Sequence, residues 1–312
     1  MTVSPTPEYP GYDSDNSMQI RKGGSSSGSL LYYDCMDILS LLIALLGLVG
    51  NGAVLWLLGF RIRRNHFSIY ILNLAAADAL FLCCSFLRSV LTLSRVFNLK
   101  WEILSFFTYI SYTAGLSLLA AISTERCLCA LFPLWYLCRR PKHTAAAVCA
   151  GLWALAGMVW LLPLLKHSFE HDFVTLFIIP SAWFLLLTCV LGVSSLTLLL
   201  RVQCSSRHRR PPRFYLLVML TVLEFLLFGL PLGVWDIMYF YYKLDRMLYW
   251  LCDTLACANS SVNPLIYFFV GRLGNKRREP LRVVLQRALG DEQELGDGTT
   301  NTPHTSSAET TL

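Results

Sequence analysis

Long apolar runs separated by short polar connections dominate the chain. Seven runs of 21 to 29 residues carry few or no charges. A helix of about 20 residues is long enough to cross a hydrocarbon layer roughly 30 Å thick. The runs are Ile38–Phe60, Phe67–Leu93, Ile103–Ala130, Ala145–Leu165, Phe173–Leu200, Phe214–Tyr242 and Met247–Val270. We therefore predict an all-α membrane protein whose seven-transmembrane helix bundle covers residues 38–270.

Basic residues are concentrated in every second connection, which predicts the orientation of the chain in the membrane. Seventeen Lys and Arg residues lie in the first, third and fifth connections and after the last run, against seven on the other side. Cytoplasmic loops carry an excess of Lys and Arg. We expect the amino terminus to be extracellular and the carboxyl terminus cytoplasmic, in the plasma membrane.

The composition agrees with a membrane protein. Hydrophobic residues make up 55% of the chain and charged residues only 15%, against about 25% charged in soluble domains. The net charge of +6 lies on the predicted cytoplasmic side, where the lipid bilayer is anionic, so no nucleic-acid partner needs to be invoked. A soluble enzyme is excluded.

The polar ends of the chain predict three further segments. Residues 1–29 have no apolar signal-peptide core, and GGSSSGS at 23–29 has the composition of a flexible linker. We therefore expect residues 1–37 to form an extracellular disordered tail. Apolar residues at helical spacing predict a cytoplasmic amphipathic helix within 271–290. Residues 291–312 are acidic and rich in Ser and Thr, which predicts a disordered cytoplasmic tail.

Three ionisable residues lie five or six positions from the outer ends of their runs. They are Arg88, Asp236 and Asp253. A charge inside a bilayer costs about 2.5–3.5 kcal/mol, so each such residue suggests a function. The three carry a net charge of −1, which favours a cationic or zwitterionic peptide or small amphiphile as ligand. Aromatic walls are expected from Tyr109, Tyr112, Trp235, Tyr239 and Trp250.

A different interpretation removes two of these residues from the ligand site. Arg88 and Asp253 can pair with each other across neighbouring helices, which leaves Asp236 as the remaining acid. Deeper in the bilayer, we expect Glu224 to be protonated and hydrogen-bonded to a neighbouring helix, because burial disfavours its charged form.

Short motifs in six of the seven runs resemble the rhodopsin-like G protein-coupled receptors. They are GN at 50–51, LAAAD at 74–78, ERC at 125–127, Trp153, Pro231 and NPLIY at 263–267. FSIYIL at 67–72, LFP at 131–133 and VLQRAL at 284–289 resemble the Mas-related receptor family in particular. The resemblance implies a receptor that converts binding of an extracellular ligand into activation of a heterotrimeric G protein, of the Gq or Gi family.

The resemblance also implies roles for single residues. Asp78 and Asn263 would belong to a polar cluster at mid-depth, with a sodium ion near Asp78 as the only cofactor. Arg126 and Tyr267 would rearrange when the sixth span opens a cleft for the G protein, and Pro231 would supply the bend. Glu125, Gly229 and Pro264 complete the expected activation and coupling set; Gly229 stands where related receptors usually carry a tryptophan.

In such a bundle the outer ends of spans one and seven are neighbours, and each carries a cysteine. We therefore predict a disulfide between Cys35 and Cys252, with two free thiols as the alternative. On the cytoplasmic side, the resemblance implies that receptor kinases and arrestin act on the Ser/Thr-rich tail. The last residues resemble a ligand of a PDZ-domain protein, with Thr310 and Leu312 filling its two pockets.

Other functions fit the sequence less well. No metal-ligand cluster, phosphate-binding loop or catalytic arrangement is recognisable, so we predict that the protein is not an enzyme and holds no catalytic or structural metal. A transporter would show paired repeats. The main alternative is a constitutively active or accessory receptor that modulates a partner receptor, because Arg213 and Phe214 at the start of span six provide no acid to restrain Arg126.

Overall fold

The structure, a computed structural model, describes residues 27–62, 65–95, 101–132, 141, 143–167, 178–205, 213–242, 246–273 and 280–289. Every regular element in these ranges is a helix. The order along the chain is α2 (Ser27–Trp56) with the π-helical turn η1 (Leu57–Arg61), α3 (His66–Ser94), α4 (Trp101–Leu131), α6 (Thr144–His167), α7 (Ile179–Ser205), α8 (Arg213–Glu224), η3 (Phe225–Gly229), α9 (Leu230–Tyr242), α10 (Arg246–Arg272) and α11 (Leu281–Leu289).

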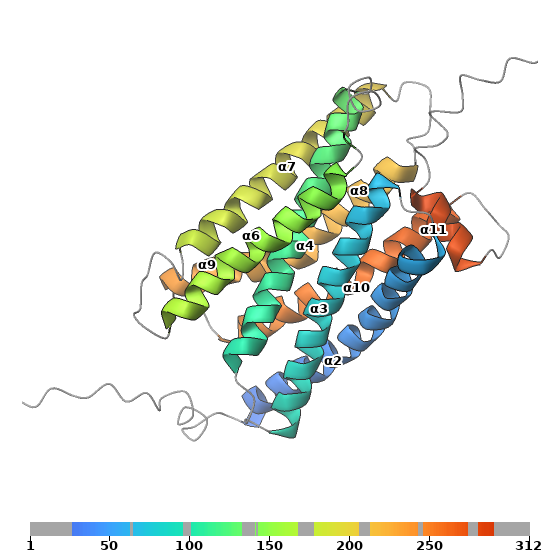
Figure 1. The fold of residues 1–312 in the computed structure, drawn as a ribbon. Coiled ribbons are helices and arrows are strands. Elements are labelled where there is room, and N and C mark those ends of the chain that lie inside the picture. Colours follow the sequence, from blue (N-terminus) through green and yellow to red (C-terminus); the bar gives the residue numbers. More distant parts are fainter. Residues whose placement is uncertain are drawn as a thin grey trace, which may run out of the picture.

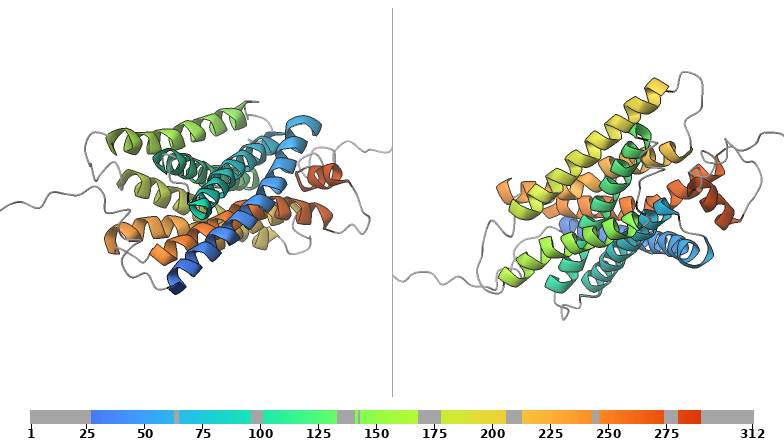
Figure 2. Two further views of the ribbon diagram at one scale, coloured as in Figure 1. Left: turned by 90° about the horizontal axis from the view of Figure 1, so that it is seen from below. Right: turned by 45° about the horizontal axis from the view of Figure 1, so that its top comes forward.

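The long helices form one bundle (Figure 1). Helix α4 lies in its middle, packed against α3, α6 and α7, as the two views of Figure 2 show. By length and composition, six helices of the described residues can cross a membrane, if α8, η3 and α9 count as one. Helix α10 is the seventh of the bundle and is more polar, because Asp253, Asn259 and Asn263 lie on it and are buried.

Helix α2 begins earlier than the sequence predicts. It starts at Ser27, so the expected tail boundary at residue 37 and the linker interpretation of residues 27–29 are wrong. Contacts with α10 explain the added turns: the Tyr32 hydroxyl donates to the Met247 carbonyl at 3.2 Å, and the Tyr33 and Trp250 ring centroids are 6.2 Å apart. Residues 1–26 of the predicted tail lie outside the described ranges.

The sixth span is continuous but changes its helical form halfway. Helix α8 passes into the π-helical turn η3 and then into α9, and the Leu230 amide donates to the Phe225 carbonyl five residues earlier. Pro231 follows at once and has no amide hydrogen to donate to the residue four positions before it. The π-helical turn therefore lies where the proline weakens the α-helical hydrogen-bond pattern.

A short helix lies across the end of α10, within the range predicted for an amphipathic helix. Helix α11 buries Val284, Leu285 and Ala288 and packs against α10 and α8. Close packing is possible because residue 271 is a glycine: a Cβ there would lie 2.1 Å from the Val284 carbonyl oxygen. The predicted tail 291–312, with Thr310 and Leu312, lies outside the described residues.

Candidate functional site

A cavity of about 520 Å³ opens between α4, α6, α7, α9 and α10, toward the end of the bundle opposite α11. We call it the aromatic pocket. Its lining is Tyr109, Tyr112, Thr113, Leu116, Val159, Trp160, Pro180, Ser181, Trp183, Phe184, Leu187, Gly233, Trp235, Asp236, Ile237, Tyr239, Tyr249 and Trp250. Half of these 18 residues are aromatic. Such a volume and lining suit a ligand of drug or short-peptide size.

Ring stacking holds the aromatic walls in place. The Tyr109 and Trp160 rings stack with centroids 4.5 Å apart, and the Trp160 indole nitrogen donates to the Thr113 hydroxyl at 2.8 Å. On the opposite wall, Trp235 lies 4.7 Å from both Tyr239 and Tyr249, measured between ring centroids. Fixed rings of this kind provide surfaces for apolar groups and for cations.

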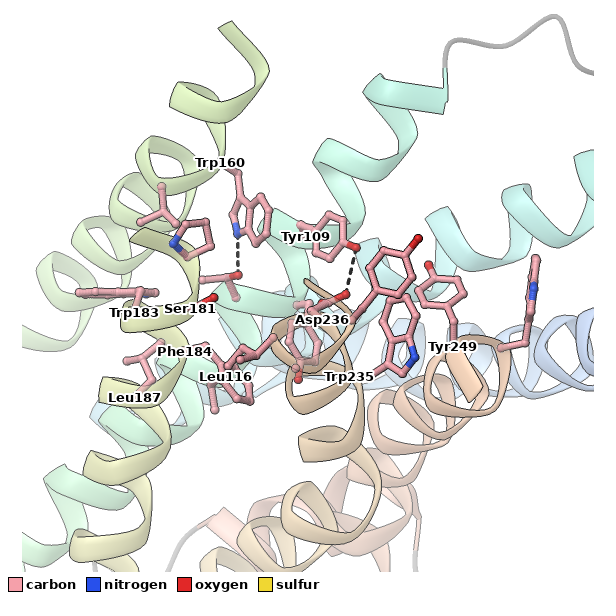
Figure 3. Close-up of a pocket in the computed structure, with 18 residues that line it drawn as sticks. Tyr109, Leu116, Trp160, Ser181, Trp183, Phe184, Leu187, Trp235, Asp236 and Tyr249 are labelled. Atoms are coloured by element: carbon pink, nitrogen blue, oxygen red, sulfur yellow. Dashed lines mark hydrogen bonds between the residues drawn. The ribbon is translucent and has the colours of Figure 1, made fainter. Parts of the chain in front are cut away.

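Asp236 is the single carboxylate among the lining residues. It comes from α9 and lies between Tyr109 and Trp235 in Figure 3. The Tyr109 hydroxyl donates to its Oδ1 at 3.3 Å, and the side chain is only partly buried. An acid in this setting can pair with a ligand cation while the neighbouring rings exclude water.

Arg88 and Asp253 are paired with each other, as the second interpretation of the sequence proposed. Arg88 Nη2 donates to Asp253 Oδ2, and Arg88 Nη1 donates to the Tyr249 hydroxyl at 3.0 Å. Asp253 is 1% exposed, and neither member of the pair lines the pocket. The structure therefore places Arg88 and Asp253 behind Tyr249, outside the lining of the pocket.

The other six residues predicted for the ligand site all line the pocket. They are Tyr109, Tyr112, Trp235, Asp236, Tyr239 and Trp250. Trp160, Trp183, Phe184 and Tyr249 were missed. Tyr249 could have been found, because it lies four residues before Asp253 and so on the same face of α10. Helices α6 and α7 are apolar on all sides, so no pattern distinguishes the face that carries Trp160 or Phe184.

One hydrogen bond connects the pocket with the π-helical turn. The Tyr112 hydroxyl, in the pocket wall, donates to the Gly229 carbonyl at 2.8 Å. Gly229 itself allows close packing, because a Cβ there would lie 2.5 Å from Phe225 Cδ2 and 2.9 Å from Asn259 Oδ1. The pocket wall is therefore joined through Tyr112 to the point where α8 and α9 meet.

The predicted coupling residues gather between the pocket and the α11 end. The Asn263 amide donates to Asp78 at 2.9 Å, and Tyr267 is buried one turn further along α10. Pro264 lies inside α10 next to Gly50 of α2, where a Cβ would come within 3.2 Å of the proline ring.

The acid and base that end α4 are both buried. Glu125 is 8% exposed and Arg126 is 3% exposed. The Arg126 guanidinium lies over the Phe67 ring of α3, 4.3 Å from its centroid. In this conformation Arg126 therefore lies inside the bundle, against α3.

The predicted disulfide is not formed. Cys35 and Cys252 are both free thiols; Cys35 is exposed, whereas Cys252 is buried beside Ala44, Phe81 and Leu82. One thiol lies on the surface of the bundle and the other is packed inside it, so the neighbouring helix ends do not bring the sulfur atoms together. The alternative of two free thiols is the one observed.

Comparison with known proteins agrees with this architecture. The model of the family described as 7 transmembrane receptor (rhodopsin family) matches residues 50–267. The Mas-related G-protein coupled receptor member X2 of Homo sapiens is 46% identical over 283 residues, covering 82% of this chain and 83% of the relative. The member X2 of Macaca mulatta is 46% identical over 282 residues, with the same coverage. The member X1 of Mus musculus is 40% identical over 284 residues, covering 86% of this chain and 88% of the relative.

The range matched by the family model, residues 50–267, includes every residue that lines the aromatic pocket. The matches confirm the fold class and the family predicted from the sequence motifs, and they imply a multi-pass protein of the plasma membrane with an extracellular ligand and a G protein as partners. The chain belongs to the Mas-related G protein-coupled receptors, within the rhodopsin-like seven-transmembrane family.

Proposed function

We propose that this receptor binds an extracellular cationic or zwitterionic ligand, a peptide or small amphiphile, whose positive group pairs with Asp236. The single observation that carries the proposal is one carboxylate in a pocket whose lining is half aromatic. The orientation belongs to the proposal: the amino terminus and the pocket mouth face outward, and α11 lies on the cytoplasmic side.

The ligand would act on the sixth span at two points. Its cation would pair with Asp236 on α9, and its apolar body would press on Tyr112, which holds the Gly229 carbonyl. Both contacts are close to Pro231, where the helix lacks an amide hydrogen. A ligand that binds one arrangement of α8 and α9 more tightly shifts the population toward that arrangement.

The cytoplasmic end would then open for a heterotrimeric G protein of the Gq or Gi family. The family and the buried Arg126 support this step, because release of its guanidinium from the Phe67 ring would expose a basic group at the end of α4. Receptor kinases, arrestin and a PDZ-domain protein are further proposed partners of the tail, through its Ser/Thr-rich segment and through Thr310 and Leu312.

The test is G protein dissociation in cells that express the wild type or Asp236→Asn, with a panel of cationic peptides and small amines. A hydrogen bond to a charged group contributes about 1.5–3 kcal/mol, so the concentration for half-maximal response should rise roughly 10- to 100-fold. Glu102→Gln is the matched control, because this exposed acid lies in the first turn of α4 and does not line the pocket.

Two results would contradict the proposal. A cationic agonist that acts equally on the wild type and Asp236→Asn at equal surface expression would show that the acid does not bind it. A wild type that signals without ligand and ignores the whole panel would instead favour the constitutively active or accessory receptor. Arg126→Ala should abolish both an agonist response and any ligand-independent signal. Its loss of signalling shows that the measured response comes from this receptor.

A further inference from the structure

A second cavity, of about 350 Å³, lies on the flank of the bundle between α3, α4, α6 and α7. We call it the flank groove. It adjoins the aromatic pocket, because Leu187 of α7 lines both cavities, whereas the other described lining residues of the two cavities differ. From Leu187 the groove extends past Ala120 to Glu125 and Leu128, near the end of α4. It is therefore a separate space that lies closer to the Arg126 end of the bundle.

The floor of the groove is a face of α4 with small side chains. Ser117, Ala120, Ala121 and Thr124 line the groove at helical spacings of three and four residues, which places them on one face. The Ser117 and Thr124 hydroxyls donate to carbonyl oxygens of α4 itself, at 2.7 Å each, so these donors are already used. Helices α6 and α7 both pack against α4 but only loosely against each other. Small residues beneath two separated helices therefore leave an apolar cavity.

The groove opens sideways, toward the lipid. Leu128 and Val190 line it and are 39% and 37% exposed in the isolated chain. Both belong to helices that are long and apolar enough to cross a membrane, so their exposed side chains contact hydrocarbon rather than water. A ligand of the groove therefore arrives dissolved in the bilayer, and most of its surface has to be apolar.

One acid lines this apolar groove. Glu125 is 8% exposed and is the single charged side chain among the described lining residues. Arg126, next to it in the chain, lies over the Phe67 ring and does not line the groove. A carboxylate has two oxygens and accepts several hydrogen bonds, so the contacts of Glu125 within the bundle do not use up its capacity. An acid in this position favours a positively charged group on the ligand.

Three other buried acids of the bundle line neither the flank groove nor the aromatic pocket. They are Asp78, Glu224 and Asp253. Within the described part of the chain, neither carboxylate oxygen of Glu224 has a hydrogen-bond partner, so the hydrogen bond to a neighbouring helix that the sequence predicted is not made there. Compared with these three acids, Glu125 is the one that a molecule in the bilayer can reach.

We propose that the flank groove binds a cationic amphiphile from the membrane, whose amine pairs with Glu125 and whose apolar body lies on the small residues of α4. With the orientation proposed above, the groove lies in the cytoplasmic leaflet, where anionic lipids concentrate such cations. The apolar body also contacts Leu187, and so touches the wall of the aromatic pocket from the other side. Binding in the groove does not depend on the ligand of the aromatic pocket.

The experiment is photolabelling of purified full-length receptor in phosphatidylcholine nanodiscs. The probe is dodecylamine with a diazirine near the end of its chain, and the matched probe is dodecanol with the same diazirine. Mass spectrometry identifies the labelled peptides. We expect the amine, far more than the alcohol, to label the peptides that carry Ala121, Leu128 and Val148. Glu125→Gln should raise the amine concentration for half-maximal labelling roughly 10- to 100-fold, the range for loss of a charge-assisted hydrogen bond.

Three further variants separate the groove from the charge and from the aromatic pocket. Ala121→Leu fills the floor, keeps Glu125 and should remove most of the amine label. Ala147→Leu makes the same change at an exposed position of α6 outside the groove and should keep the label. Asp236→Asn removes the acid of the aromatic pocket and should also keep it, so this site and the proposed ligand site fail or hold separately.

Four results would overturn the proposal. Equal labelling by the amine and the alcohol, or labelling spread evenly over the lipid-facing helices, would show that the probes report only the bilayer. An unchanged amine concentration in Glu125→Gln would refute the pairing with this acid. If Glu125→Gln does not fold, undiminished labelling of Ala121→Leu refutes the groove. Loss of the label in Asp236→Asn would instead place the amine in the aromatic pocket.

Discussion

Breaking the pair between Arg88 and Asp253 should lower the stability of the receptor itself, in the absence of any ligand. Asp253 is 1% exposed and the Arg88 side chain 11% exposed, so each charge depends on the other. Asp253→Asn leaves the guanidinium buried without its counter-charge. Removal of one member of a buried pair typically costs about 3–5 kcal/mol. At roughly 2–4 °C per kcal/mol, the melting temperature should fall by about 6–20 °C.

The double variant Arg88→Met/Asp253→Leu provides the matched comparison. Both charges are absent and the side-chain volumes are similar, so most of the lost stability should return, as it does when other buried pairs are replaced by apolar residues. The assay is thermal unfolding of purified receptor without ligand, together with surface expression. If Asp253→Asn unfolds at the wild-type temperature but loses its agonist response, the carboxylate serves the ligand and our account of the pair is wrong.

Two smaller changes test the packing around α11 and the sixth span. Gly271→Ala places a Cβ against the Val284 backbone and should destabilise the receptor by about 1–3 kcal/mol. Gly151→Ala, with open space around it, is the control and should be neutral or stabilising. Thermal unfolding of both variants measures the difference, and equal melting temperatures would contradict the packing account. Tyr112→Phe removes the hydrogen bond to Gly229 and should cost about 1 kcal/mol; an unchanged melting temperature and an unchanged basal G protein signal would show that this bond does not restrain the sixth span.

The bundle could be predicted from the sequence because apolar length is a local property. The predicted runs coincide with long helices wherever the structure describes them, apart from shifted ends. The early start of α2 was missed, since Tyr32 and Tyr33 become helical through contacts with Met247 and Trp250, more than 200 residues away in the chain. The sequence pattern carries no trace of such distant contacts.

The pocket was predicted in part because only some of its residues stand out in the sequence. Asp236 is visible as a charge among apolar residues. Trp160 contributes a stacked ring and a hydrogen bond, yet it comes from a helix that is apolar on every side. Likewise, the outward direction of Cys35 depends on the rotation of α2, which helix order alone does not define.

The π-helical turn between Glu224 and Leu230 also bears on how this receptor can change over evolution. A π-helical turn holds about one residue more than an α-helical turn. The side-chain faces of α8, before the turn, and of α9, after it, are therefore set independently of each other. Substitutions in α9 can adapt the pocket to new chemistry without rotating Glu224 away from α10. The two halves of the sixth span can therefore diverge as separate modules, one selecting the ligand and the other preserving the coupling to the cell interior.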